Sequence, residues 1–176
     1  MKHTYLIREA RESDAEAFLA YTKIVGSESN YLSFGKDGIP ISIQEEADFI
    51  RNCQNDSHNA MWCAIDHEEI IAVCSFDAVK NKRMAHRASV GISVRKSYWN
   101  QGIATAMMQK LMEHAKALGD ITMLTLEVIC ENEHAIHLYE RFGFQICGCL
   151  HQFFRIDGKD YDAYIMECDL RKGALR

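Results

Sequence analysis

The chain has 176 residues, of which 48% are hydrophobic and 26% charged, a balance typical of a globular protein rather than a disordered or fibrous one. Its formal net charge of −5 at pH 7 gives no general attraction to nucleic acid or to an anionic membrane. The seven cysteines are an odd number and lie mostly in apolar runs, which indicates reduced core thiols rather than a disulfide framework.

Targeting and boundary signals are absent from the sequence. No stretch approaches the roughly 18 consecutive apolar residues of a membrane span, and the first residues lack the apolar core of a signal peptide. We therefore expect a cytoplasmic protein with no membrane or nucleic-acid partner. Charges are interspersed, without a linker or repeat, so we expect a single domain over residues 1–176.

The first predicted elements are a strand and two helices. The run TYLIREA is typical of a strand. Ser13 and Glu16 have the spacing of a capping box, which predicts the start of a helix, and Ser42 with Glu45 predicts a second helix in the same way. Residues 26–40 between them, GSESNYLSFGKDGIP, have the composition of a loop.

The middle of the chain predicts three strands and a long helix. The runs AMWCAID and IIAVCSFDAV are separated by HEE, which indicates a hairpin, and RASVGISV predicts another strand. From Ala104 to Leu118, apolar residues recur at helical spacing, and Gly119 is expected to end this helix.

The last third predicts a strand, a helix and a hairpin. ITMLTLEVIC is typical of a buried strand, and a helix is expected from Asn132 to Gly143. Two further strands, FQICGCLHQFFRI and DYDAYIMECDL, are joined by the turn DGKD. The order β-α-α-β-β-β-α-β-α-β-β predicts an α/β (α+β) fold with a mixed sheet covered by helices, because strand–helix–strand units need crossovers whereas hairpins make antiparallel pairs.

The stretch WNQGIATA places a glycine between a strand and a helix. The first amides of a helix have no partner within the helix, and the helix dipole favours negative charge there. Asn100 to Thr105 would offer such amides to a diphosphate, and Gly102 would let the ligand approach the backbone. The stretch matches neither a P-loop nor the dinucleotide fingerprint. Taken alone, it is better explained as a small-residue helix start packed against a neighbour.

A second motif follows after one predicted helix and one predicted strand. It reads N-x-x-A-x-x-L-Y-x-x-x-G-F from Asn132 to Phe144. Together with Q-G-x-A from Gln101 to Ala104, it resembles the GNAT superfamily of acyl-CoA-dependent N-acetyltransferases. The resemblance is most specific over residues 90–150 and extends, through the order of elements, to nearly the whole chain. It implies a single GNAT-like domain with a mixed, mostly antiparallel sheet and about four flanking helices.

The resemblance also implies acetyl-CoA as co-substrate and a set of residues that bind it. The diphosphate would be held by the backbone of Asn100, Gln101, Gly102, Ile103, Ala104 and Thr105. The pantetheine arm would contact backbone groups of Ile92 and Val94 and the helix residues Asn132, Ala135 and Leu138. Gly91 is expected to mark a bulge that separates its strand from the next one and admits the thioester.

One position departs from the family pattern. That pattern usually begins with Arg or Gln, and Trp99 stands there in this chain. Arg95, Lys96 or Asn100 could take over the role of the missing donor. The alternative, which we expect, is that Trp99 packs beneath the loop as a core side chain.

Glu127 is the candidate base. Acetyl transfer to an amine needs the amine in its neutral form, and an alkyl amine with a pKa of about 10.4 is almost fully charged at neutral pH. Glu127 is the only carboxylate in the apolar run MLTLEVIC, and apolar surroundings would raise its pKa. The resemblance adds that the glutamate of the matching L-E-V triplet is the proposed base of N-terminal protein acetyltransferases. The alternative is a glutamate that pairs with a cation or lies at an exposed edge.

Tyr139 is the candidate acid for the thiolate leaving group. It lies about two helical turns after Asn132 and therefore on the same face of the helix. Ordinary phenol and thiol pKa values, about 10 and about 8.5, are close enough for proton donation. The resemblance implies the same role, because the tyrosine of L-Y-x-x-x-G-F is the usual acid of the family. The alternative is a core tyrosine with a satisfied hydroxyl group.

The acceptor pocket is expected at the loop between the first two helices and at the last hairpin, as in other members of the superfamily. Tyr31, Phe34 and Asp37 could hold a cationic amine, with Phe153 and Phe154 beside it. A plain surface loop is the alternative.

We expect no metal ion. Cys147 and Cys149 would share one face of a strand, which leaves a zinc site there as an alternative. His134 and His137 lie on one helix but lack a carboxylate or cysteine partner at ligand spacing, so we read them as exposed histidines.

The sequence thus predicts an N-acetyltransferase that passes the acetyl group of acetyl-CoA to a primary amine of a small molecule or peptide, by direct attack in a ternary complex. Two alternatives stay open: a catalytically degenerate acyl-CoA-binding module, and a protein N-terminal acetyltransferase. A homodimer is common in such families. The acceptor itself is not determined, because specificity depends on the shape of loops.

Overall fold

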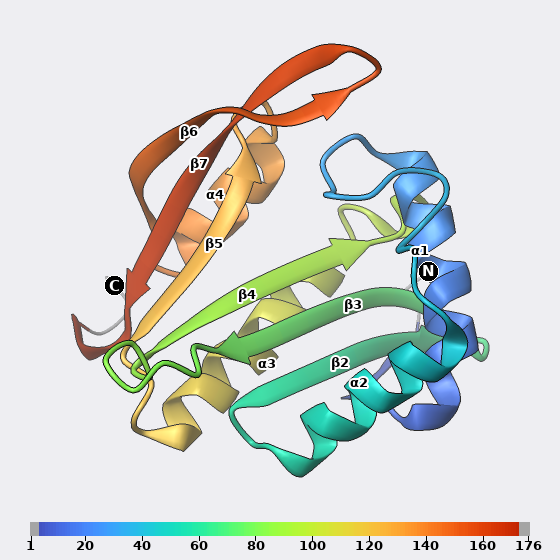
Figure 1. Cartoon of the computed structure of the whole chain (residues 1–176), viewed down its shortest axis with the longest axis horizontal. Helices are drawn as coiled ribbons and strands as arrows, with labels where there is room; N and C mark the ends of the chain where they lie inside the picture. Colours follow the sequence, from blue (N-terminus) through green and yellow to red (C-terminus); the bar gives the residue numbers. More distant parts are fainter. Residues whose placement is uncertain (1–3, 173–176) are drawn as a thin grey trace. The chain divides into compact units, whose positions relative to one another are not determined.

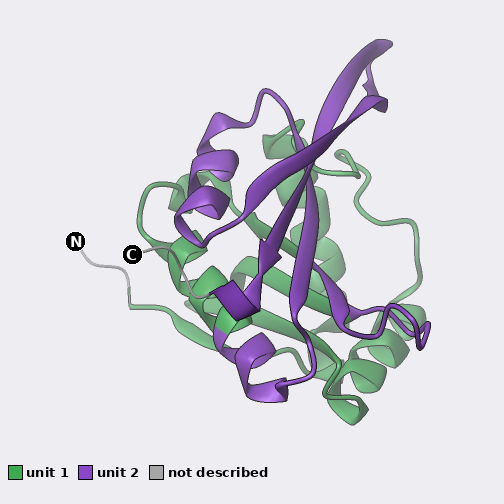
Figure 2. Cartoon of the chain, turned by 90° about the vertical axis from the view of Figure 1, so that its left-hand side faces the viewer, with its two compact units in different colours: residues 1–77, 91–112 green, residues 78–90, 113–176 purple. Residues whose placement is uncertain are grey.

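The structure is a computed structural model that describes residues 4–172. The chain forms two compact units that interleave along the sequence (Figure 2). Unit 1 comprises Met1–Asp77 and Gly91–Met112, and unit 2 comprises Ala78–Val90 and Glu113–Arg176. This division reflects compactness alone, and the single domain expected over residues 1–176 stays a prediction.

The elements follow one another in the predicted order (Figure 1). The strands are β1 (Leu6–Glu9), β2 (Asn59–Asp66), β3 (Glu69–Ala78), β4 (Arg87–Val94), β5 (Met123–Ile129), β6 (Gln145–Ile156) and β7 (Lys159–Asp169). The helices of the described residues are α1 (Ala15–Glu28), α2 (Ile43–Asn55), α3 (Ile103–Leu118) and α4 (Glu133–Arg141), with short 3-10 turns η1 (Glu12–Asp14), η2 (Lys96–Tyr98) and η3 (Leu170–Lys172). The strand order is β1-β2-β3-β4-β5-β7-β6.

The expected mixed, mostly antiparallel sheet is confirmed. β4 and β5 run parallel, as a crossover through α3 requires, whereas β1 with β2, β2 with β3, β5 with β7 and β6 with β7 are antiparallel. Both predicted hairpin turns form. His67 and Glu68 have φ values of 46° and 67°, and Asp157 and Gly158 have φ values of 50° and 80°, as the two central residues of a type I′ turn require.

The core of unit 1 lies where α1 and α2 cover β2 and β3. Its members include Phe18, Tyr21 and Val25 from α1, Ile50 from α2 and Met61 from β2. Tyr21 also reaches the hydroxyl of Ser93 on β4 at 2.9 Å. Buried aromatic and aliphatic side chains of this size each contribute about 1.5–3 kcal/mol of transfer free energy, so this cluster holds the two helices on the strands.

Of the two predicted capping boxes, one is confirmed and one is wrong. The Ser42 hydroxyl accepts from the Glu45 amide, and the Glu45 carboxylate accepts from the Ser42 amide at 2.7 Å. Ser13 lies inside η1 instead of capping α1. Its place is taken by Asp14, whose carboxylate accepts from the Arg11 amide at 2.7 Å and binds the Arg8 guanidinium with both oxygens. A bidentate pair of charged groups is stronger than a hydrogen bond from a neutral capping residue, and here it fixes η1, the turn that precedes α1.

The loop after α1 begins later than predicted. Gly26 to Glu28, expected in the loop, belong to α1. A Cβ on Gly26 would lie 2.0 Å from the carbonyl oxygen of Gly35, so the loop folds back against the helix at a place where no side chain fits. The side chains of Leu32, Phe34 and Ile39 then pack against the core of unit 1.

In unit 2, β7 pairs with both β5 and β6, and these long strands appear at the orange and red end of the colour range in Figure 1. α4 ends as predicted at Gly143, which has a φ of 88°. The amides of Gly143 and Phe144 bond back to the carbonyls of Glu140 and Tyr139, and this closes the helix with its usual left-handed glycine.

The cysteines are all free, but the prediction of core thiols holds only for some of them. Cys53, Cys63, Cys74 and Cys168 are buried, whereas Cys147 and Cys149 are exposed. The register of β6 shifts between Ile146 and Gly148, so the two exposed cysteines are not the simple same-face pair that strict alternation predicts.

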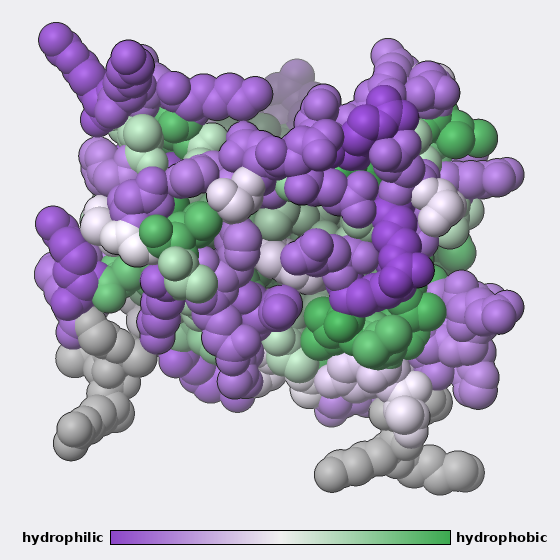
Figure 3. Space-filling view, turned by 90° about the horizontal axis from the view of Figure 1, so that it is seen from below, coloured by the Kyte–Doolittle hydropathy of each residue, from purple (hydrophilic) through white to green (hydrophobic). Residues whose placement is uncertain are grey.

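The surface is mainly hydrophilic, as the composition of a globular protein predicts. On the face shown in Figure 3, hydrophilic side chains predominate and hydrophobic ones form separate patches. Large apolar side chains that are exposed elsewhere on the chain are scattered over different elements, for example Leu6, Ile43 and Met84. Within the described residues, no helix has the length and apolar character needed to cross a membrane.

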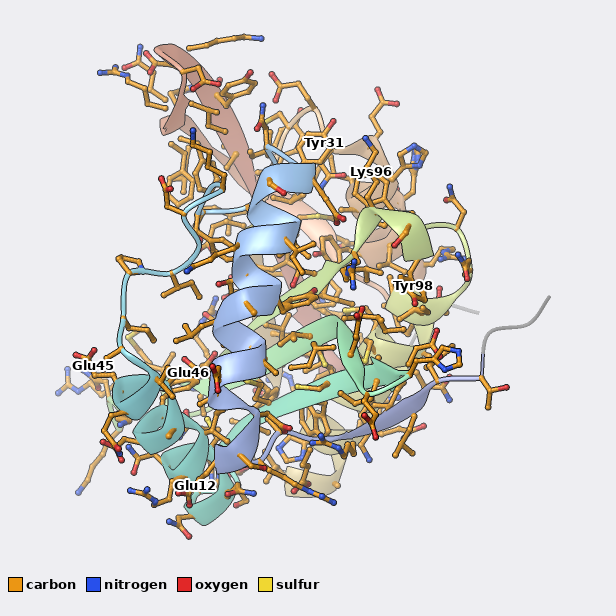
Figure 4. The ribbon with its side chains drawn as sticks, turned by 90° about the vertical axis from the view of Figure 1, so that its right-hand side faces the viewer. Glu12, Tyr31, Glu45, Glu46, Lys96 and Tyr98 are labelled. Atoms are coloured by element: carbon orange, nitrogen blue, oxygen red, sulfur yellow. The ribbon has the colours of Figure 1, made fainter. Side chains whose placement is uncertain are left out.

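Glu46 is a buried carboxylate that the sequence did not single out. It lies on α2 with 3% of its surface exposed, and Figure 4 labels it beside α1. Its Oε1 atom is buried without a hydrogen-bond partner among the described residues. Burial raises the pKa of this carboxyl to about 7, because the charged form loses its hydration and gains no compensating bond.

Glu46→Gln should therefore stabilise the protein in a pH-dependent way. The folded state binds the Glu46 proton more tightly than the unfolded state, so this group's contribution is fully present below its ordinary pKa of 4.5 and is lost as the pH rises through about 7. Above pH 7, we expect the variant to gain up to about 3 kcal/mol in the free energy of unfolding, and little at pH 4.

Urea unfolding of both proteins between pH 4 and pH 8 measures this difference. Glu16→Gln, which changes an exposed glutamate of α1, is the matched control and should show no such pH dependence. An equal gain from Glu46→Gln at pH 4 and pH 8 would contradict the explanation.

Candidate functional site

The predicted diphosphate loop forms a backbone turn at the start of α3. Asn100 and Gly102 both have left-handed backbone angles, with φ values of 61° and 81°. The first bond within the helix runs from the amide of Ala106 to the carbonyl of Gly102 at 3.0 Å, so the helix provides no acceptor for the amides before Ala106. Ile103 is buried, whereas Gln101 and Gly102 are exposed. The loop thus presents the positive end of a helix dipole at the surface.

Gly102 faces open space. A Cβ built on this glycine would meet no atom within 4 Å, so packing does not explain the residue. Its left-handed φ does, because L side chains rarely adopt that conformation. The amides of Ile103 and Ala104 are therefore approachable from the side of Gly102, which is the geometry that an anion needs at a helix N-terminus.

Trp99 does not lie in the core, so the expectation of a core side chain beneath the loop is wrong. The side chain is 38% exposed, and its indole N–H donates to the carbonyl of Val94 at 2.8 Å. The ammonium group of Lys96 lies 5.9 Å from the centre of the indole ring. Trp99 therefore braces the segment between β4 and α3 from outside, by a hydrogen bond and a cation–π contact.

Two further contacts, which sequence reasoning missed, hold the same segment. The Tyr98 hydroxyl donates to the carboxylate of Asp66 at 3.0 Å, and the Lys96 amide donates to the carboxylate of Glu28 at 2.7 Å. Figure 4 labels Lys96 and Tyr98 on the turn that follows β4. The partners are 32 and 68 residues away in sequence, so no local pattern could have revealed them.

The predicted pantetheine strand has mixed support. The carbonyl of Val94 already accepts the Trp99 indole, so a further contact of Val94 would use its N–H or the second lone pair. The described pairs between β4 and β5 run from Arg87 with Met123 to Ser89 with Thr125 and end before Gly91. The bulge at Gly91 and the contacts of Ile92 and Val94 with pantetheine stay predictions.

The second motif places its polar residue at the start of α4. Asn132 is the N-cap, and its side chain accepts from the Ala135 amide at 3.3 Å. This accounts for Asn132 as a structural residue, independently of any ligand. Ala135 is half-buried and Leu138 is buried, and the binding role expected for the three residues stays a prediction.

Tyr139 is buried, and its acidity is lower than the sequence led us to expect. The side chain is 7% exposed and its ring lies 5.9 Å from that of Phe144. Burial raises the pKa of the phenol to about 12, because the phenolate would lose its hydration. The expected near match between the pKa of this phenol and the ordinary pKa of a thiol, about 8.5, is therefore wrong. The phenol is protonated at any physiological pH, and it can donate a hydrogen bond to a thiolate more readily than a whole proton.

Glu127 is exposed on β5, so the expectation of apolar surroundings is wrong. The residue pairs with Ile165 of β7, and its neighbours Leu126 and Val128 are buried on the opposite face of the strand. Alternation explains the difference, because the apolar residues next to it in sequence point away from it. Its role as base stays a prediction.

The residues expected at the acceptor pocket fall into two groups. Tyr31 is exposed, whereas Phe34 is half-buried and packs against the core of unit 1. In unit 2, the rings of Phe153 and Phe154 meet edge to face at 4.8 Å, and Phe153 is 44% exposed. Phe34 is thus explained by packing, while Tyr31 and Phe153 are available to a ligand.

A hollow of about 360 Å³ in unit 1 involves none of the predicted site residues. Its lining includes the basic side chains Arg8, Arg11 and Lys110. Arg8 is paired with Asp14, and Glu9 also lines the hollow, so its charges are mixed rather than purely basic.

Comparison with known proteins decides the family, since residues 29–144, more than half of the chain, match the acetyltransferase (GNAT) family. The chain belongs to the GNAT family of acetyltransferases. A GNAT-family acetyltransferase of Streptococcus pneumoniae has a similar crystal structure, with a TM-score of 0.89, 30% sequence identity, and coverage of 93% of this chain and 98% of that one. The predicted family and fold are therefore confirmed.

Two further proteins resemble the chain, one in sequence and one in fold. The L-amino acid N-acetyltransferase AaaT of Escherichia coli (strain K12) is 29% identical over 98 residues, which cover 56% of this chain and 60% of that protein. The protein yncA of Salmonella typhimurium, solved with its cofactor acetyl-CoA, has the same fold, with a TM-score of 0.81 at 16% identity over 97% of this chain and 96% of that one. The chain thus spans less than two thirds of the length of the first curated relative.

Replacement of Trp99 distinguishes an outer brace from a core side chain. Trp99→Ala removes one hydrogen bond and a partly exposed ring, so we expect a loss of about 1–2 kcal/mol in the free energy of unfolding. A buried tryptophan would cost about 3–5 kcal/mol, and Trp62→Ala, at a residue that is 1% exposed, is the control that should lose this much.

Urea unfolding gives both values, and acrylamide quenching of the fluorescence reports the exposure of each tryptophan. The Trp62→Ala protein should be quenched more strongly than the Trp99→Ala protein. Equal quenching of the two would count against an exposed Trp99.

Proposed function

We propose that this GNAT-family chain is an N-acetyltransferase that passes the acetyl group of acetyl-CoA to a primary amine of a small molecule or peptide, by direct attack in a ternary complex. The observation that carries the proposal is the open, left-handed turn at Asn100 and Gly102, which leads into α3 within the family's motif. When it is bound, acetyl-CoA supplies the acetyl group as an activated thioester.

The diphosphate of acetyl-CoA fits the loop from Asn100 to Thr105 on physical grounds. A diphosphate needs several N–H donors and no side chain in its way. The start of α3 provides amides that the helix does not use, and the empty space at Gly102 gives access to them. The binding relies on the backbone, so it does not require the Arg or Gln that Trp99 replaces.

The chemical roles follow from the resemblance and from the state of each side chain. Tyr139, protonated and buried, would donate to the sulfur as charge develops there. Glu127, an exposed carboxyl group on β5, would accept a proton from the amine directly or through water. The formal charge of −5 favours a cationic amine over an anionic acceptor.

Release of free CoA thiol tests the proposal and separates it from a degenerate acyl-CoA-binding module. Purified protein with saturating acetyl-CoA would be offered polyamines, aminoglycosides, amino acids and peptide N-termini, and we expect thiol release above the hydrolysis background with at least one class. Tight binding of acetyl-CoA without release for any amine would favour the degenerate module, and release with peptide N-termini alone would favour a protein N-terminal acetyltransferase.

Gly102→Ala should weaken acetyl-CoA binding measured by calorimetry. The new methyl group occupies the approach to the amides, and the left-handed backbone disfavours alanine by about 1 kcal/mol. Gly119→Ala is a matched control, because Gly119 at the other end of α3 also has a left-handed φ, 77°, and nothing within 4 Å of its Cβ position. We expect similar losses of stability from both changes and a loss of binding, of about tenfold or more, from Gly102→Ala alone. Equal affinities would refute the assignment of the loop.

Tyr139→Phe should lower kcat by about 10²-fold while leaving acetyl-CoA affinity unchanged, because it removes only the donor and keeps the ring against Phe144. The group acts in its protonated form, and activity from it would be lost only as the pH rises through about 12. The alkaline limb of the wild-type pH–rate profile should therefore not depend on Tyr139. Tyr161→Phe on β7 is the control. Unchanged turnover of Tyr139→Phe at every pH would remove the acid assignment.

A further inference from the structure

Three metal-ligating side chains of unit 2 converge on the hairpin of β6 and β7. Cys149 and His151 come from β6 and Asp162 from β7, and one ligand atom of each lies within 4.8 Å of the others. The His151 Nδ1 and Asp162 Oδ2 atoms are 3.0 Å apart. None of the three belongs to the residues assigned to acetyl transfer.

The strand register explains why these side chains share a face. Cys149 is paired with Tyr164, and Asp162 lies two residues before Tyr164 on β7, so alternation puts Asp162 on the same side as Cys149. The register then shifts between Leu150 and Phe154, where Gln152 has a φ of 52°. Such a bulge bends its strand and re-aims side chains, and here it turns His151 toward Asp162.

Asp162 is oriented from the backbone. Its Oδ1 atom accepts from the Gln152 amide at 2.8 Å, which leaves Oδ2 directed at His151. Metal ligands in proteins are commonly oriented by hydrogen bonds of this kind from neighbouring groups. The competing explanation is that Asp162 only stabilises the bulge, and that explanation gives no role to the exposed thiol of Cys149.

Cys130 brings a second thiol to the group. Its amide donates to the Asp162 carbonyl at 3.0 Å, so the end of β5 is fixed beside β7. Burial, followed by a hydrogen bond to the Cys149 thiol, raises the pKa of the Cys130 thiol. The strand register agrees, because Val128 is paired with Tyr164, the partner of Cys149, and Cys130 follows Val128 by two residues. Alternation therefore puts Cys130 on the face of the sheet that Cys149 and Asp162 share.

The chemistry of the ligand side chains favours zinc over other metal ions. Two thiolates, an imidazole and a carboxylate suit zinc, whereas magnesium and calcium prefer all-oxygen sites. Zinc–ligand bonds of about 2.0–2.3 Å in a tetrahedron place ligand atoms about 3.3–3.8 Å apart. In the structure the ligand atoms of Cys149, His151 and Asp162 lie within 4.8 Å of one another, so zinc binding requires these side chains to move by about 1 Å. The side chains of His151 and Asp162 are 80% and 42% exposed, so both have room to move by this distance.

We propose that Cys149, His151 and Asp162, with Cys130 as the fourth ligand, form a zinc site on unit 2. This differs from the absence of a metal ion that the sequence predicted, and it is independent of the proposed acetyl transfer. Bound zinc would tie the end of β5 to β6 and β7 through side chains. Binding releases the thiol protons, so the affinity should rise with pH.

Zinc titration of the full chain tests the site. The protein is reduced with a phosphine, freed of metal, and titrated with zinc chloride against a chelating dye. We expect one zinc per chain with micromolar or tighter affinity, and a melting temperature that rises with zinc. Cobalt(II) in place of zinc should give the thiolate-to-metal absorption band and the strong visible bands of a tetrahedral site.

Matched cysteine variants identify the ligands. Cys149→Ser and Cys130→Ser should each lower zinc affinity by at least about tenfold and weaken the thiolate-to-cobalt band. Cys147→Ser changes the neighbouring exposed cysteine and should leave both unchanged. Circular dichroism of each variant confirms its folding. Absence of stoichiometric binding, or equal effects of Cys147→Ser and Cys149→Ser, would overturn the proposal, and an unchanged affinity in Cys130→Ser would overturn the fourth ligand.

Discussion

The open backbone turn at the start of α3 is the constraint on which the proposed function depends. A helix leaves its first amides without partners, and they must find water, a side chain or a ligand. In this chain the left-handed residues Asn100 and Gly102 turn the backbone into the helix without placing a side chain over those amides. The charge of an anion is then met by the helix dipole and by directed N–H groups together.

This loop keeps its conformation through contacts made by the segment in front of it. Trp99, Tyr98 and Lys96 reach Val94, Asp66 and Glu28 respectively, and the last two belong to β2 and α1. A turn with left-handed residues is costly on its own, and such contacts make it the preferred state. Trp99 thus takes up a supporting role at the position where the GNAT pattern has a polar donor, and the proposed binding of phosphate by the backbone does not depend on that donor.

The ionisable groups that are buried in the structure are not the ones that the sequence suggests. Glu127 lies among apolar letters and is exposed, whereas Glu46 lies among polar letters, EEAD, and is buried. The reason is geometrical. A strand sends neighbouring residues to opposite faces, and the first turn of α2 points one of its glutamates toward the core. Tyr139 shows the same effect, because the packing that positions it also raises its pKa to about 12.

The sequence by itself determined the order of elements, both hairpin turns, the ends of α3 and α4 and the family, because each depends on local signals such as periodicity, turn glycines or a short motif. The tertiary structure alone decided the exposure of Trp99 and Glu127, the replacement of the Ser13 cap by Asp14 with Arg8, and the meeting of Cys149, His151 and Asp162. These features depend on strand register and on partners distant in the chain. The free energy that selects them comes from packing and charge pairing, which one-dimensional patterns do not contain.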